Sequence, residues 1–196
     1  MPPHTYVFFG PSGSGKGTQA RLLIEELKKK DSEKRILYLE TGDKLREFAD
    51  EASLSAEYTK EILAKGELLP EFLPIWVWTE YLIRHVSGHE HIIIDGSPRK
   101  LEEAGILDSA MKFYKRERPV VISIEVGPEW ARERLLERGR SDDNEKEIKH
   151  RLQWYEINVR PAIDFFKNNE YYTFLAINGE RSIEEVHKDI IEKLKI

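Results

Sequence analysis

Residues 5–27 read TYVFFGPSGSGKGTQARLLIEEL, and this stretch decides the fold. It opens with an apolar run at positions 6–9 and passes through a loop of glycines and serines. It then continues with Ala20, Leu23, Ile24 and Leu27 at the spacing of one helix face. The pattern predicts a buried strand, a loop and a helix in direct succession.

The loop has the spacing G-x-x-x-x-G-K of a P-loop at Gly10, Gly15 and Lys16. Its glycines allow successive backbone N–H groups to point at one anion, and the start of the following helix adds partial positive charge. Lys16 supplies a full charge, so a triphosphate is the expected ligand. Position 17 is glycine where the usual P-loop has Ser or Thr, which leaves Thr18 or Ser14 as the hydroxyl for a Mg²⁺ contact.

Composition limits the classes of function. The 196 residues suffice for one domain with small insertions, and 40% of them are hydrophobic. A net charge of −5 argues against nucleic-acid or anionic-membrane partners, and the absence of cysteine excludes disulfides, thiolate catalysis and zinc–sulfur sites. No signal peptide opens the sequence, and no apolar run has the length of a membrane span. We therefore expect a soluble cytoplasmic protein that uses no zinc.

Apolar runs alternate with helical patterns along the whole chain. The expected strands cover residues 5–10, 35–40, 91–95, 120–126 and 171–177. Their nearly continuous apolar character is typical of strands that are covered on both faces. The helical segments between them predict an α/β fold, in which helices flank a parallel sheet of these strands.

Two stretches interrupt this alternation. Residues 41–70 are helical in pattern and lie between two strands, so they predict a small helical insertion. Residues 138–150 read RGRSDDNEKEIKH and predict an exposed polar flap that runs into a helix capped by Asp142 or Asp143. Both stretches belong to the side of an open α/β sheet where ligands bind.

Residues 71–86 predict a helix that is apolar, and therefore buried, on most sides. Two interpretations remain: the helix lies deep under the sheet, or one face forms a homo-oligomer interface, where aromatic residues are enriched. His85, His89 and His91 lack the geometry of a helical ligand set because a Ser-Gly turn intervenes. We interpret this region as a solvated loop that leads into the strand at 91–95, rather than as a metal site.

Arginines outside the P-loop indicate the chemistry. Phosphoryl transfer between two nucleotides brings several anions together, and arginine pairs phosphate oxygens in two-point fashion without losing its charge. The arginines that follow strand ends or flank the polar flap are Arg46, Arg99, Arg138, Arg140 and Arg151. For Arg132 and Arg134 we expect surface ion pairs instead.

Several motifs follow one another in the order found in adenylate kinases and related nucleoside monophosphate kinases: GPSGSGKGTQ, TGDKLR, KGELLP, DGSPR, RLLERGR and DDNEKEIKHRL. The chain resembles this family, in its short-lid form, over essentially its whole length. The resemblance implies a P-loop NTPase fold with a five-stranded parallel sheet. It implies a core of residues 1–40, 71–137 and 152–196, a helical monophosphate-binding domain of residues 41–70 and a short lid of residues 138–151.

The resemblance also implies a reaction and roles for individual residues. The reaction is reversible phosphoryl transfer from Mg-ATP to a nucleoside monophosphate, ATP + AMP = 2 ADP, with Mg²⁺ as cofactor. The implied catalytic residues are Lys16, Arg99, Arg138, Arg140 and Arg151. Those implied to bind ATP are Gly13, Ser14, Gly15, Lys16, Gly17, Thr18, Arg138, Gly179 and Arg181, with the loop 178–182 against the adenine. Those implied to bind the monophosphate are Thr41, Arg46, Leu63, Gly66, Leu69, Gly96, Arg99 and Glu103. Asp95 would hold Mg²⁺ through water with Thr18 as a further candidate, and Asp142 and Asp143 would act in lid closure.

The chain departs from the family pattern in its lid and near the monophosphate site. Only Gly139 separates Arg138 from Arg140, so the lid is short, and Ser97 replaces the aromatic residue usual in the DG-x-PR motif. Glu103 stands where the family has a glutamine that reads adenine. An ionised glutamate only accepts hydrogen bonds, which suits guanine better than N1 of adenine. We therefore hypothesise relaxed acceptor selectivity, in which GMP or a pyrimidine monophosphate competes with AMP.

Other interpretations stay open. Glu103 could point away from the base, Glu102 could occupy its position, or Glu103 could be protonated. The main alternative function is a UMP/CMP kinase or another nucleoside monophosphate kinase. A P-loop NTP hydrolase is less favoured because no N-K-x-D pattern for guanine is present. A nucleotide-binding module without turnover is less favoured because Lys16 and the full set of arginines are present.

Overall fold

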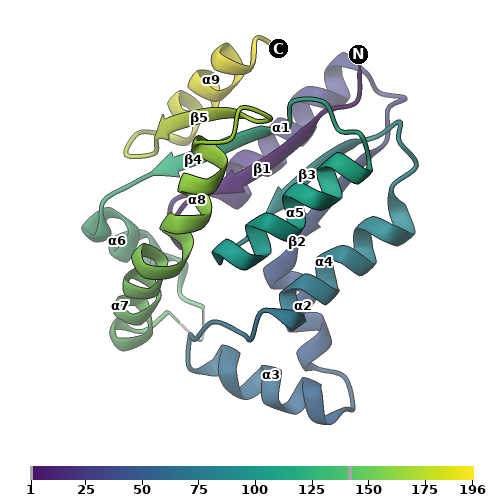
Figure 1. Ribbon diagram of the computed structural model, residues 1–196. Helices are drawn as coiled ribbons and strands as arrows, with labels where there is room; N and C mark the ends of the chain where they lie inside the picture. The colour runs from purple at the N-terminus through teal and green to yellow at the C-terminus, as the bar shows by residue number, and fades with distance from the viewer. Residues whose placement is uncertain (1, 141–142) are drawn as a thin grey trace.

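A five-stranded parallel sheet forms the centre of the computed structural model, which describes residues 2–140 and 143–196 (Figure 1). The strands lie in the order β2-β3-β1-β4-β5, and every neighbouring pair is parallel. Their bounds are β1 Thr5–Phe9, β2 Ile36–Glu40, β3 His91–Asp95, β4 Val120–Glu125 and β5 Thr173–Asn178. The predicted α/β fold is confirmed, although β5 begins at Thr173 rather than at position 171.

Helices cover both faces of this sheet. Their bounds are α1 Lys16–Lys30, α2 Thr41–Ala49, α3 Leu54–Ala64, α4 Phe72–His85, α5 Leu101–Phe113, α6 Pro128–Arg138, α7 Glu145–Trp154, α8 Arg160–Lys167 and α9 Ile183–Leu194. α1 and α9 cover one face, and α4, α5 and α8 cover the other (Figure 1). α2 and α3 form one pair of helices, and α6 and α7 form another. Both pairs lie past the same end of the strands (Figure 1).

The core consists of a hydrophobic cluster on each face of the sheet. Val7 and Phe9 of β1 pack into the cluster under α4, α5 and α8, whereas Tyr6 and Phe8 pack into the cluster under α1 and α9. This division follows from the two-residue period of a strand. All residues of β1 are buried because the strand lies in the middle of a sheet that is covered on both faces.

α4 is buried on one side only. Val77, Trp78 and Leu82 face the core, whereas Phe72 and Ile83 keep 65% and 74% of their surface exposed. The prediction of a helix that is buried on most sides is therefore wrong. The physical reason is that, within the described residues, β2 and α2 are packed against only one face of α4.

α7 and α8 form one continuous helical path through a π-helical turn, Tyr155–Val159. Pro161 follows this turn, and it lacks a backbone N–H while its ring crowds the carbonyl four residues earlier. A regular α-helix cannot continue through such a point, and a π-helical turn accommodates it. None of the helices in the described part of the chain is long and apolar enough to cross a membrane.

Candidate active site

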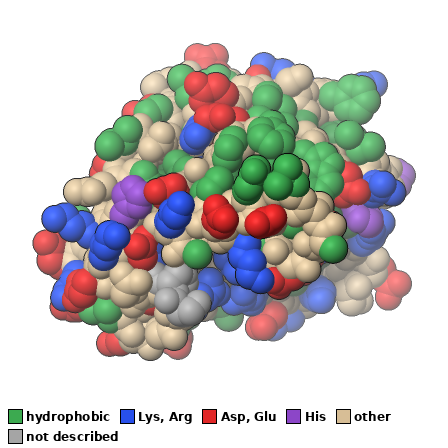
Figure 2. Space-filling view, turned by 90° about the horizontal axis from the view of Figure 1, so that it is seen from below, with side chains coloured by type: hydrophobic (Ala, Val, Ile, Leu, Met, Phe, Trp, Pro, Cys, Tyr) green, Lys and Arg blue, Asp and Glu red, His purple; other side chains and the backbone are tan. Residues whose placement is uncertain are grey.

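A cavity of about 370 Å³ opens at the carboxyl ends of the strands. The P-loop forms its floor, α2 and α3 contribute Arg46 and Leu63, and α6 and α7 contribute Arg138 and Arg151. Its volume lies within the range of small-molecule sites in proteins. Figure 2 looks onto the molecule from the side of α3 and α7, where basic and acidic side chains are interspersed and apolar side chains gather in a separate patch.

Most of the residues that the sequence singled out line this one cavity. They are Gly13, Ser14, Gly15, Lys16, Gly17, Thr18, Arg46, Leu63, Gly66, Asp95, Gly96, Arg99, Arg138, Arg140, Arg151, Gly179 and Arg181. Thr41, Leu69 and Glu103 do not line it. Thr41 is buried with no hydrogen-bond partner for its hydroxyl, and Leu69 packs in the small apolar cluster between α2 and α4.

The P-loop joins β1 to α1, and contacts within the loop stabilise its curled backbone. The backbone N–H of Ser14 donates to the carbonyl of Pro11 across 3.1 Å, and Lys16 Nζ lies 3.4 Å from the same oxygen. A Cβ at Gly13 would lie 2.5 Å from the carbonyl oxygen of Ala131 in α6, and Gly13 has a φ of +87°, so no other residue fits there. Burial lowers the pKa of Lys16, and the nearby Asp95 carboxyl opposes that shift.

Arg99 and Arg46 face the cavity from the side of β3 and α2. Arg99 Nε donates to the carbonyl of Gly96 across 2.8 Å, and its guanidinium lies 5.7 Å from the centroid of the Trp154 ring. Burial lowers the pKa of Arg99, but an arginine stays charged at neutral pH. Arg46 forms an ion pair with Asp43 and lies 4.0 Å from a carboxylate oxygen of Glu40.

Asp143 holds two of the flap arginines together. Arg138 donates two hydrogen bonds of 2.8 Å to its carboxylate, and Arg151 donates one of 2.7 Å. The backbone N–H of Arg140 adds a further bond of 3.1 Å. Burial acts to raise the pKa of Asp143, but the bonds from Arg138 and Arg151 outweigh it and hold this pKa at about 2. The carboxylate is therefore ionised, and it fixes both guanidinium groups at the cavity wall.

The cap of α7 differs from the prediction. Asn144, not Asp143, caps this helix, and its side-chain oxygen accepts a hydrogen bond of 3.0 Å from the backbone N–H of Glu147. Asp143 is unavailable as a cap because its carboxylate is engaged by the arginines. Asp142, the other candidate for the cap and for lid closure, lies outside the described residues.

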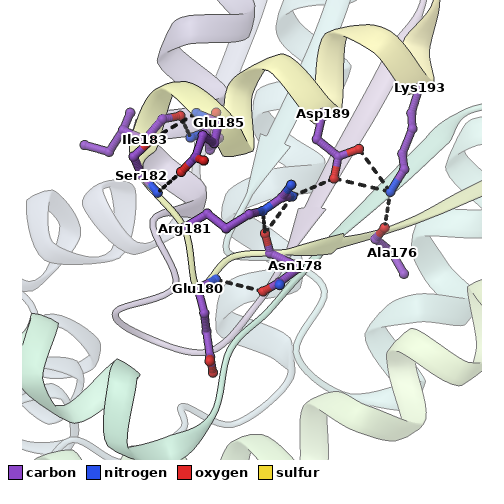
Figure 3. A network of polar contacts seen from close by, with 10 residues as sticks. Ala176, Asn178, Glu180, Arg181, Ser182, Ile183, Glu185, Asp189 and Lys193 are labelled. Carbon is purple, nitrogen blue, oxygen red and sulfur yellow. Dashed lines mark hydrogen bonds and ion pairs between the residues drawn. The ribbon is translucent and has the colours of Figure 1, made fainter.

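Arg181 lies in the loop between β5 and α9 and lines the cavity. Figure 3 shows the polar contacts that surround it. The Arg181 guanidinium donates to the carbonyl of Asn178 at 3.0 and 3.2 Å and to Asp189 at 2.6 Å. Ser182 and Glu185 form a capping box at the start of α9. These bonds hold the loop on both sides of Arg181.

Arg134 departs from the expectation of a surface ion pair. Its guanidinium lies 5.1 Å from the centroid of the Trp130 ring, and the residue lines the cavity. The sequence did contain a signal, because Arg134 precedes Arg138 by one helical turn and therefore shares its face of α6. Arg132 behaves as predicted and forms an exposed ion pair with Glu145.

Glu103 is turned into the protein. It is 2% exposed, and its carboxylate accepts a hydrogen bond of 3.1 Å from the backbone N–H of Arg99. Burial raises the pKa of Glu103, and the bond from Arg99 opposes that shift. In this arrangement the carboxylate supports the loop that carries Arg99 and does not face the cavity.

Asp95 is a buried carboxylate with one unsatisfied acceptor oxygen. It is 3% exposed, and its Oδ1 has no hydrogen-bond partner in the protein. Burial raises its pKa, and Lys16 opposes that shift. The described residues contain no cluster of His, Cys, Asp and Glu that could hold a metal alone. A buried carboxylate in a phosphate site fits Mg²⁺, which keeps several waters and is bound largely through the phosphates of its substrate.

The sheet order and the P-loop define the class of protein: a P-loop NTPase fold with basic side chains gathered at one nucleotide-sized cavity. The family model for adenylate kinase matches residues 8–171. The chain is 35% identical over 188 residues to the adenylate kinase of Prochlorococcus marinus, which covers 96% of this chain and 97% of that protein.

Further similar proteins are also adenylate kinases. The chain is 33% identical over 192 residues to the adenylate kinase of Leptospira biflexa, which covers 96% of this chain and 98% of that protein. It is 32% identical over 184 residues to adenylate kinase 1 of a Nostoc species, which covers 94% and 95%. The chain therefore belongs to the adenylate kinase family and is an enzyme of the nucleoside monophosphate kinase class.

Proposed function

We propose that this chain catalyses the reversible transfer of the γ-phosphoryl group of Mg-ATP to AMP, which yields two ADP. One observation carries the proposal: Lys16 and the arginines at positions 46, 99, 138, 140 and 151 line a single cavity. That cavity is bounded by the P-loop on one side and by the helical insertion on the other. Two nucleotides with their phosphates facing each other would meet there.

The reaction needs no nucleophilic side chain. A phosphate oxygen of the acceptor forms a bond to the γ-phosphorus, and the bond from that phosphorus to the β,γ-bridging oxygen breaks, so ADP leaves with the electron pair. The protein contributes positioning and charge stabilisation. Lys16 and the P-loop amides would orient the donor, Arg46 and Arg99 would hold the acceptor phosphate, and the flap arginines would offset charge on the transferring group.

Mg²⁺ supplies charge neutralisation at the donor phosphates when it is bound with ATP. Asp95 would hold the ion through water, as its buried and unpartnered Oδ1 supports. Thr18 lines the same cavity and is a further candidate for a contact to the metal.

Residues 41–70 would act as the monophosphate-binding domain and residues 138–151 as a short lid, with the rest of the chain as the core. Glu147 of the second segment lies against Gly66 of the first, and Trp154, just beyond the second segment, bonds to the same residue, so the two segments already meet at one edge of the cavity. Closure of this edge over both nucleotides would exclude water, which otherwise would hydrolyse ATP.

The acceptor selectivity follows from the position of Glu103. Because its carboxylate accepts a hydrogen bond from the backbone N–H of Arg99 and does not line the cavity, Glu103 would not read the acceptor base as a glutamine amide would. We therefore propose relaxed selectivity, with AMP as the main acceptor and GMP or pyrimidine monophosphates as competitors. A UMP/CMP kinase remains the alternative, and the same acceptor panel separates it from the main proposal.

The test measures ADP formation from Mg-ATP with and without AMP, GMP, CMP and UMP. ADP formation that depends on added monophosphate supports a kinase. ADP formation from ATP alone identifies a hydrolase, and the absence of ADP formation identifies a binding module. A kcat/KM for AMP more than about a hundredfold above every other acceptor would end the proposal of relaxed selectivity.

We further propose that α4 can form a homo-oligomer contact. Phe72, Trp76 and Ile83 expose 65%, 46% and 74% of their surface on one helix. Exposed aromatic residues in a group are typical of protein interfaces. Sedimentation at micromolar concentration tests this, and a monomer at all concentrations contradicts it.

A further inference from the structure

Glu40 is a carboxylate at the cavity to which the sequence assigned no role. It is the last residue of β2, and it lies directly opposite Asp95, the last residue of β3, in the parallel register of these strands. Both side chains line the cavity. The hydroxyl of Tyr38 lies between them, 3.1 Å from Glu40 Oε2 and 3.4 Å from Asp95 Oδ2.

Two like charges at directly opposite positions of neighbouring strands destabilise a sheet unless a cation compensates them. Arg21 lies 3.2 Å from Glu40, and Arg46 lies 4.0 Å from it. Lys16 and Arg99 act electrostatically on Asp95, yet one of its buried carboxylate oxygens has no hydrogen-bond partner in the protein. The pair therefore contains an unsatisfied acceptor that faces the place where the donor phosphates would bind.

The P-loop lies close to this pair and offers a further oxygen atom. Gly17 stands where the usual P-loop carries a hydroxyl, and a Cβ there would already approach Asp95 Oδ2 to 3.2 Å. The hydroxyl of Ser14 in the same loop is buried and has no partner. Carboxylates at the strand ends lie close enough to this loop to support a cation there.

We propose that Glu40 is a second carboxylate of the Mg²⁺ site and that it holds, together with Asp95, the hydrated ion that accompanies the nucleotide. This inference rests on the proposed function, because the ion enters with its nucleotide. Oxygen ligands and retained waters are what Mg²⁺ prefers in phosphate sites.

The proposal predicts opposite effects with and without the metal. When Mg²⁺ is bound, the carboxylate of Glu40 attracts it and favours the complex. Without the metal the same carboxylate repels the nucleotide phosphates. A residue that only orients Arg21 and Arg46 would change nucleotide binding in one direction under both conditions.

The experiment compares the wild-type protein with Glu40→Gln. Electron paramagnetic resonance measures the affinity of Mn²⁺ for the ADP complex, and calorimetry measures ATP binding in EDTA. We expect about a tenfold loss of Mn²⁺ affinity in the variant, as for other groups that support a metal from outside its direct ligands. We expect ATP binding in EDTA to be equal or tighter. Glu156→Gln is the matched control, because Glu156 forms an exposed ion pair with Arg160 and does not line the cavity, and it should leave both values unchanged.

Wild-type Mn²⁺ affinity in Glu40→Gln would overturn the proposal, and so would weaker ATP binding in EDTA. Should this variant fail to fold, Glu40→Asp keeps the charge but withdraws it by one methylene. It should bind Mn²⁺ more weakly than the wild type, and an equal affinity would contradict the proposal. The proposed function fails separately, if the wild-type protein forms no ADP that depends on added monophosphate.

Discussion

Trp154 Nε1 donates a hydrogen bond of 2.9 Å to the backbone carbonyl of Gly66. This contact joins the end of α7 to the loop that follows α3, which are separated by 88 positions in the sequence. The same indole ring lies against the guanidinium of Arg99. Trp154 therefore contacts both the helical insertion and the residue that we propose to hold the acceptor phosphate.

This relationship predicts that Trp154→Phe raises KM for the acceptor and leaves KM for ATP unchanged. The ring remains beside Arg99, but the hydrogen bond to Gly66 is lost, and one such bond contributes about 0.5–1.5 kcal/mol, or about 2- to 12-fold. Trp154→Leu removes the stacking as well and should raise the acceptor KM further. Steady-state kinetics with each substrate varied measures this, with Trp76→Phe on α4 as control. An equal rise in both KM values would contradict the role of Trp154 on the acceptor side.

Arg99→Ala should lower kcat at least about 10²-fold, because it removes a fixed charge at the acceptor phosphate. Arg132→Ala is the matched control, since Arg132 forms an exposed ion pair with Glu145 away from the cavity lining. Its kcat should equal that of the wild type. The initial rate of ADP formation at saturating substrates measures both variants. A wild-type rate for Arg99→Ala would remove Arg99 from the proposed catalytic set.

Asp143→Asn should destabilise the fold near neutral pH by about 2 kcal/mol. The pKa of Asp143 is about 2 in the folded protein, below the ordinary value of 3.8, so its contribution is present above pH 3.8 and is lost as the pH falls through 2. Urea unfolding at pH 7 and at pH 3 measures the difference from the wild type, which should shrink at the lower pH. Asp50→Asn, which removes an exposed ion pair with Lys60, should change the free energy of unfolding little at either pH. The same loss at both pH values would contradict the assignment to the Asp143 charge.

His91 should make the wild-type protein lose stability in mild acid. His91 is 1% exposed, and burial lowers its pKa to about 4 from an ordinary 6.5, with His4, Lys34 and Arg116 adding to the shift and Asp31 opposing it. The folded state resists protonation, so the contribution of His91 is complete above pH 6.5 and falls as the pH drops toward 4. The loss approaches about 3 kcal/mol.

His91→Asn tests this prediction because its amide oxygen can still accept the hydrogen bond from the backbone N–H of His4. The variant should lose less stability than the wild type between pH 7 and pH 4, as measured by urea unfolding. His89→Asn replaces an exposed histidine nearby and should follow the wild type. Parallel pH curves for the wild type and His91→Asn would show that another group causes the acid sensitivity.

Much of the fold and the site could be predicted from sequence because the signals are local. The spacing of Gly10, Gly15 and Lys16 fixes a P-loop without reference to any distant residue. The ends of parallel strands lie at one edge of a sheet, so Arg99 after β3 and the P-loop after β1 had to lie near each other. Both line one cavity in the structure.

Other features could not be predicted because they depend on the direction in which a side chain points. Glu103 follows the family spacing, yet its carboxylate turns back to the amide of Arg99. Asp143 is of a residue type that often caps helices, but its carboxylate accepts hydrogen bonds from Arg138 and Arg151 instead. In each case two partners compete for one carboxylate, and only packing decides between them.

The sequence by itself determined the phosphate loop, the alternating layers and the set of charged groups, because each of these follows from residue type and spacing along the chain. The tertiary structure alone decided that Glu40 faces Asp95, that Trp154 bonds to Gly66 and that α4 leaves one face exposed. The first two are contacts between segments that are distant in sequence, and the third depends on which segments pack against the helix. Their energies depend on which surfaces pack together in three dimensions, and a local sequence pattern does not predict this packing.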